Sequence, residues 1–232
     1  MSSKLTNAIQ RLVFENAVHL LETSGYDWRK AKLTQSFIRS EVLMSTAQSR
    51  LHLPVLVTDA QNGNAFNTER RLQLTDVFVV SSINVEVAKP ASATDAAYDT
   101  FNFADLSVFT TAGVAAAIKG VYKNGFLSMI VDNDQMLPAW DIEWHYRAPL
   151  TQAGTNNTIA FSGATPSLNN TNSVDGNDDG IVPNEPNFIL TGNSNIDFSL
   201  NTINAMAAIE TTGRWIVRLR GVLAQNCSKI AS

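Results

Sequence analysis

Residues 214–223 read Arg-Trp-Ile-Val-Arg-Leu-Arg-Gly-Val-Leu, the clearest strand pattern in the chain. Successive side chains of a strand point to opposite faces of a sheet. Trp215, Val217 and Leu219 therefore share one face, and the arginines between and after them share the other. The pattern predicts a strand with an apolar core face and a charged outer face, which is typical of antiparallel sheets packed on one side.

Similar but shorter strand patterns recur along the rest of the chain. Asn-Gly pairs at 62–63 and 124–125 supply turn signals between them. The predicted strands are residues 51–57, 77–80, 83–87, 126–131, 136–146, 188–190 and 196–200. About eight to ten strands without a regular strand-helix-strand repeat favour two antiparallel sheets over a parallel α/β fold. The sequence therefore predicts a mainly β fold, an antiparallel β-sandwich of the jelly-roll type.

Two segments break the strand pattern and predict helices. Residues 4–23 carry apolar side chains at helical spacing and end before Gly25. The positions on the predicted face are Leu5, Ile9, Leu12, Val13, Asn16 and Leu20. This helix either packs across the end of the β domain or forms an arm that docks on a neighbouring subunit. An Ala-rich run at 112–117 predicts a short mid-chain helix.

The domain organisation follows from these elements. We expect residues 1–24 to form an N-terminal helix or arm and residues 25–232 to form a single β-sandwich domain. Gly, Asn, Ser, Thr and Asp dominate residues 151–187, with strand character only at 159–161, so this segment is expected to be a long surface loop.

Composition favours a protein that contacts other proteins. Charged residues make up only 16% of the chain, against about 25% in an average soluble domain. Interface cores are depleted in Lys and Glu, which lose rotamer freedom and hydration when covered. A net charge of −4 provides no basic field for a phosphate backbone, so direct nucleic-acid binding is not expected. No stretch of 18 apolar residues occurs, so no membrane span is expected.

The acidic segment 175–182 resembles the first half of an EF-hand calcium loop, with Asp175 at position one. It carries oxygen ligands at positions one, three and five, Gly180 at position six and a backbone carbonyl at position seven. The candidate calcium ligands are Asp175, Asn177, Asp179, Ile181 and Glu185. Position twelve is Pro186 in place of the bidentate Glu, and no helices are predicted on either side. The alternative interpretation is a solvated Asp/Asn/Gly turn.

No pattern predicts catalysis, and we expect no catalytic residue. His19, His52 and His145 share no metal-ligand spacing. The chain contains no nucleophile elbow, phosphate-binding loop or dinucleotide fingerprint. The single cysteine, Cys227, has no neighbouring base in the sequence and indicates synthesis in a reducing compartment.

The aromatic stretch 140–147 allows two interpretations. On a strand, Trp140, Ile142, Trp144 and Tyr146 would share one face. Large aromatics on one face favour a core role, with the charged residues between them outside. Flat aromatic faces beside carboxylates would instead suit a sugar platform.

Several segments resemble jelly-roll coat and capsid-associated proteins of bacterial viruses. These segments are Glu69-Arg70-Arg71-Leu72, Tyr122-Lys123-Asn124-Gly125-Phe126-Leu127 and Pro138-Ala139-Trp140-Asp141. The order of the predicted elements, from an N-terminal helix to a long final strand, is also similar. The resemblance implies a jelly roll and a structural role in a virion, and it assigns no active residue.

Two functions follow as hypotheses. The first is a non-enzymatic virion structural protein, a phage capsid or head-associated subunit, that self-assembles as a homo-oligomer. Its partners would be copies of itself and other virion proteins, and its location would be the virion after synthesis in the host cytoplasm. The second is a calcium-assisted carbohydrate-binding module used in host recognition.

Overall fold

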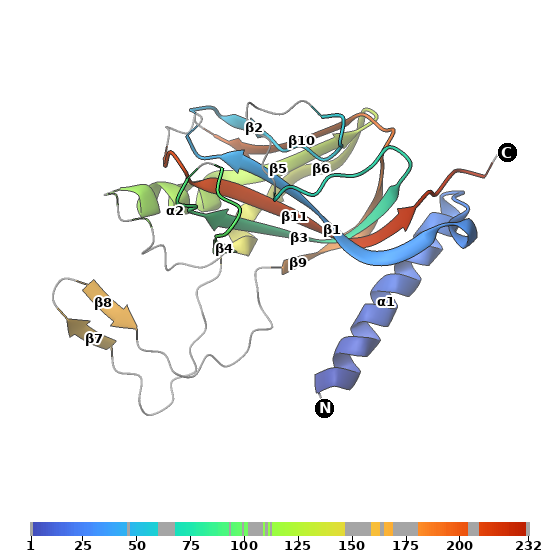
Figure 1. Cartoon of the computed structure of the whole chain (residues 1–232), viewed down its shortest axis with the longest axis horizontal. Coiled ribbons are helices and arrows are strands. Elements are labelled where there is room, and N and C mark those ends of the chain that lie inside the picture. The colour runs from blue at the N-terminus through green and yellow to red at the C-terminus, as the bar shows by residue number, and fades with distance from the viewer. Residues whose placement is uncertain are drawn as a thin grey trace.

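A computed structural model describes residues 2–45, 47–59, 68–92, 94–98, 100–101, 109, 111, 113–146, 159–162, 165–168, 181–203 and 209–230. Strands dominate it, with one helix at the N-terminus and one in mid-chain (Figure 1). The elements are α1 (Ser2–Thr23), the 3-10 helix η1 (Trp28–Lys30), β1 (Lys32–Leu43), β2 (Arg50–His52), β3 (Val77–Ala88), β4 (Thr100–Phe101), α2 (Val114–Asn124), β5 (Gly125–Val131), β6 (Asp134–Asp141), the 3-10 helix η2 (Ile142–His145), β7 (Ile159–Ser162), β8 (Thr165–Leu168), β9 (Ile181–Thr191), β10 (Ile196–Thr202) and β11 (Arg214–Gln225).

Two antiparallel sheets pack face to face as a sandwich. The first sheet has the order β1-β11-β3-β9, and the two-residue strand β4 pairs with the end of β3. The second sheet has the order β2-β10-β5-β6. Strands β7 and β8 pair only with each other among the described residues. The predicted mainly β fold, with its N-terminal and mid-chain helices, is confirmed.

The strand pairings are nested. The first long strand pairs with the last, β1 with β11, and β2 pairs with β10. Inside them β3 pairs with β9, and β5 and β6 form the innermost hairpin. One long antiparallel hairpin rolled into two sheets produces this order, which is the winding of a jelly roll.

The core between the sheets contains the apolar face predicted for the final strand. Trp215, Val217 and Leu219 are completely buried there. Helix α2 closes one end of this core. Its buried side chains are Val114, Ile118, Val121 and Tyr122, which lie on one face of the helix. The Tyr122 hydroxyl donates a hydrogen bond of 3.2 Å to the Val85 carbonyl, and its ring lies 5.4 Å from the Trp215 ring, centroid to centroid. Helix α2 therefore belongs to the sandwich core.

The outer face of the first sheet carries an apolar cluster where α1 covers it. Val79 and Val222 point outward there and pack against Ala17 and Leu21 of the helix. The sheet register shifts beside Gly221, and a Cβ at that position would lie 1.8 Å from the Val79 carbonyl oxygen. Only glycine at position 221 therefore leaves room for the irregularity in β3. The irregularity lies between the apolar end of the outer face, which α1 covers, and a charged end.

The charged end of the outer face is stabilised by ion pairs. The fully buried Glu41 carboxylate accepts hydrogen bonds from Arg214 (2.9 Å) and from the Tyr98 hydroxyl (2.8 Å), and Arg39 lies 2.8 Å from it. Arg218, predicted on the charged face, pairs with Glu86 at 2.9 Å. These contacts hold the segment around Tyr98 against the sheet, so the charges are structural and largely withdrawn from solvent.

The strand predicted over 136–146 is wrong in its second half. Strand β6 ends at Asp141, whose carboxylate accepts a hydrogen bond of 2.8 Å from the Glu143 amide and thereby caps η2. Ile142 is buried and Trp140 and Tyr146 pack against the core, as expected, but the turn of helix exchanges the positions of Trp144 and His145. Trp144 is 52% exposed, whereas His145 is completely buried and its Nε2 accepts a hydrogen bond of 2.9 Å from Trp140 Nε1.

Two other expectations differ from the structure. The segment 151–187 includes the hairpin β7–β8 and the beginning of β9 at Ile181, because β9 supplies the outer partner of β3. Among residues 11–23 of α1, the buried side chains are Ala17 and Leu21, and Leu20 of the predicted face packs against the same cluster. Leu12 of the predicted face is instead 58% exposed, and small Ala17 allows the helix to approach the sheet closely.

Candidate functional site

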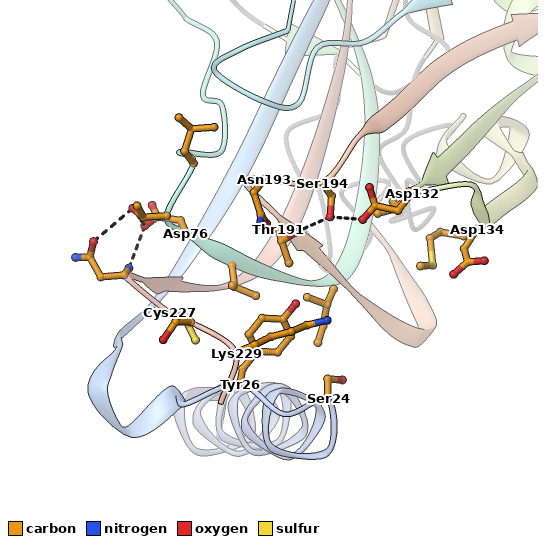
Figure 2. A pocket seen from close by; sticks show the side chains of 18 residues that line it. Ser24, Tyr26, Asp76, Asp132, Asp134, Thr191, Asn193, Ser194, Cys227 and Lys229 are labelled. Carbon is orange, nitrogen blue, oxygen red and sulfur yellow. Dashed lines mark hydrogen bonds between the residues drawn. The ribbon is translucent and has the colours of Figure 1, made fainter. Parts of the chain in front are cut away.

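A groove of about 740 Å³ lies beside the end of α1 (Figure 2). This is the end of the sandwich opposite α2 (Figure 1). Five segments distant in the sequence form the groove. They are the turn after α1, the start of β3, the β5–β6 turn, the β9–β10 turn and the residues after β11. The nested pairing brings these segments together, because antiparallel strands place alternate turns at the same end of the sheets.

Asp132 joins two of these turns. It has a φ of 50° and lies with Asn133, φ 73°, in the two-residue turn between β5 and β6. Its carboxylate accepts hydrogen bonds from the Ser194 hydroxyl at 2.6 Å and the Asn195 amide at 2.8 Å. These two hydrogen bonds lower the pKa of Asp132, since they stabilise its ionised form. Asp132 is therefore a fixed negative charge at the groove.

Asp76 fixes the opposite side of the groove. It is 7% exposed, and its carboxylate accepts a hydrogen bond of 3.1 Å from the Asn226 amide just after β11. Its backbone carbonyl accepts a hydrogen bond of 2.9 Å from the Gly192 amide. A Cβ at Gly192 would lie 1.8 Å from the Gln73 carbonyl oxygen, so only glycine lets the β9–β10 turn lie this close.

The lining combines apolar surface with one cation. Val77, Val131 and Ile189 contribute apolar side chains. The Lys229 ammonium lies 5.6 Å from the centroid of the Tyr26 ring, a cation–π contact. Burial is the main cause that raises the pKa of the Tyr26 hydroxyl, which therefore stays neutral at pH 7.

Electrostatically, the groove is acidic. Asp76, Asp132 and the exposed Asp134 all line it, against the single cation Lys229. Cys227 also lines it, but burial raises the pKa of its thiol and keeps it protonated at pH 7. The arrangement suits an apolar segment that carries positive charge and offers no activated nucleophile.

Of the residues predicted to bind calcium, Asp175, Asn177 and Asp179 lie outside the described residues. Ile181 is the first residue of β9, opposite Asn84 of β3. Glu185 is exposed on the same strand. The calcium site stays a prediction.

The three histidines lie on different elements, His19 on α1, His52 on β2 and His145 in η2. Within the described ranges, no three His, Cys, Asp or Glu side chains are grouped so that they could hold a metal ion. None of the described helices is long and apolar enough to cross a membrane.

Sequence reasoning did not find the groove. Asp76, Asp132, Asp134 and Lys229 belong to none of the motifs described above. The available signal was the Asp-Asn-Asp turn at 132–134, but its partners come from segments at least 50 residues away in the chain. Comparisons with protein-family models, curated proteins and solved structures gave no match.

Proposed function

We propose that this chain is a non-enzymatic structural protein of a virion, a phage capsid or head-associated subunit that self-assembles through protein–protein interfaces. The observation that carries the proposal is the nested pairing of eight strands into the sheets β1-β11-β3-β9 and β2-β10-β5-β6. Viral coat domains use this jelly-roll winding. The inference from fold to function is an analogy, since lectin domains share the architecture.

The surface supports an assembling role. Charged residues are 16% of the chain, and part of them are withdrawn into the ion pairs around Glu41. Large apolar side chains are exposed at several places. They include Leu12 at 58%, Leu74 at 54% and Ile203 at 76%. Low charge with exposed apolar side chains favours contact with other protein.

Helix α1 also supports assembly. Its second half contacts the sandwich through Ala17 and Leu21. Its first half extends beyond the body of the protein (Figure 1). A short helix without tertiary contacts is marginal in water, so contact with another subunit would stabilise it.

The test is the size of the purified protein. We expect analytical ultracentrifugation to show growth with concentration and electron microscopy to show symmetric rings, shells or lattices without added ligand. A monomer at every concentration would contradict the proposal. A monomer that also binds a glycan array in calcium, but not in chelator, would favour the carbohydrate-binding alternative.

A further inference from the structure

Near its middle, α1 exposes apolar side chains. Leu12 is 58% exposed and Phe14 36% exposed, and the Arg11 side chain is 81% exposed. A cavity of about 290 Å³ lies between Val13 and Phe37 of β1, where the helix separates from the sheet. Ala17 and Leu21, which pack closely on the sheet, lie on the C-terminal side of this point.

The composition of the first half of α1 indicates what it would bind. Residues 1–12 contain Lys4 and Arg11 and no Asp or Glu. Arg11 also forms an exposed pair with Glu15 at 2.7 Å, which is weak because solvent screens it. Apolar residues at helical spacing accompany the two cations. The segment is therefore a basic amphipathic helix, which fits an acidic groove with apolar walls.

The groove at the end of the sandwich has the complementary properties. Asp76, Asp132 and Asp134 line it, together with apolar side chains from the four strands β3, β5, β6 and β9. At its rim Leu74 is 54% exposed. Asp132 is held in place by Ser194 and Asn195. A preformed acidic groove of this kind binds a cationic helix without reorganising its own charges.

The helix that fills the groove must come from another copy. Ser24, one residue after α1, lines the groove. A helix rises about 1.5 Å per residue, so Leu12 lies roughly 18 Å from Ser24 along the helix of the same chain. Because α1 runs away from the groove, its first half cannot enter it while the helix is intact.

We propose that residues 2–12 of one copy bind in the groove formed by Asp76, Asp132 and Asp134 of a second copy. This inference rests on the proposed self-assembly and names the contact that drives it. Each copy has one such helix and one groove, so the contact either swaps helices within a pair or continues head to tail around a ring.

Cross-linking between two copies that carry cysteines at different positions tests the contact. In a Cys227→Ser background, one copy carries Ala8→Cys and the other carries Asn193→Cys, an exposed position that lines the groove. A short bis-maleimide is added to the mixed full-length proteins after thermal melts show that both are folded. We expect a mixed two-chain product. The matched control replaces Asn193→Cys by Lys123→Cys on α2, at the other end of the sandwich, and we expect at least tenfold less product.

The outcomes separate this inference from the proposed function. Large assemblies without the mixed product, or with equal product in the Lys123→Cys control, overturn the helix-in-groove contact and leave self-assembly intact. A protein that stays monomeric overturns both. As a second measurement, Leu12→Glu is expected to weaken assembly at least tenfold, whereas Lys123→Glu leaves it unchanged. Normal assembly of Leu12→Glu would also overturn the contact.

Discussion

At the residue scale, Asp132 connects the β5–β6 turn to the β9–β10 turn by accepting hydrogen bonds from Ser194 and Asn195. Its lowered pKa means that the contribution to stability is present above the unfolded pKa, about 4, and is lost as the pH falls through the folded value. We expect Asp132→Ala to lower the melting temperature at pH 7 and to lower it less at pH 3. Thermal melts at both pH values measure this, and equal shifts would contradict it.

Glu41 is the residue whose loss should cost most on the outer face. Its carboxylate is completely buried and balances both Arg39 and Arg214. Removing one partner of a buried ion pair costs about 3–5 kcal/mol, because the remaining charge stays in a poorly solvated site. We expect this loss for Glu41→Ala in urea unfolding. Glu15→Ala, which removes the exposed partner of Arg11, is the matched control and should cost less than about 1 kcal/mol.

At the scale of elements, the two halves of α1 have different roles. Removing residues 2–12 should leave the melting temperature unchanged and weaken assembly, since Ala17 and Leu21, which pack on the sandwich, remain. Removing residues 2–23 should also lower the melting temperature and the solubility, because it uncovers Val79 and Val222. Melts and size-exclusion profiles of the two truncations distinguish these roles. Equal assembly by the shorter truncation and the full chain would contradict the first expectation.

The calcium prediction concerns the segment before β9. Ligand that binds only the folded state raises the melting temperature. If the segment binds calcium through Asp175 and Asp179, millimolar calcium should raise the melting temperature modestly relative to chelator, and magnesium should raise it less. The double variant Asp175→Ala, Asp179→Ala is the control. A parent protein that melts identically in calcium and chelator would leave the segment as a solvated turn.

Helix α1 shows what apolar spacing in the sequence can and cannot predict about a helix. Apolar spacing predicted the helix and placed Leu20 on its packed face, but it did not predict that Ala17 and Leu21 are buried. The buried line contains Ala17, whose small side chain allows close approach, while larger Leu12 stays exposed. Spacing reports which residues share a face, and only the shape of the opposing sheet decides which face packs. The strand predicted over 136–146 ends early for a related reason. The hydrogen bond from the Glu143 amide to the Asp141 carboxylate begins a turn of 3-10 helix, which the alternating pattern does not predict.

At the scale of the whole molecule, alternation and turn signals were enough to predict an antiparallel sandwich. The core face of the strand that begins at Arg214 was predicted correctly, since Trp215, Val217 and Leu219 are buried as the pattern indicates. The groove could not be predicted in the same way. Asp76, Asp132 and Lys229 meet only through pairings between distant strands, and local patterns contain no information on such distances.

The nested pairing also bears on how the chain is made. Strand β11 lies between β1 and β3 in the first sheet, although 125 residues separate Ala88 from Arg214 in the sequence. At roughly 5–20 residues per second, a ribosome needs about 6–25 s to synthesise that interval. During this time β1 and β3 have been synthesised, but β11, which pairs with both, has not. Unpaired apolar strand edges aggregate readily, so chaperone capacity in that window should set the yield of folded protein.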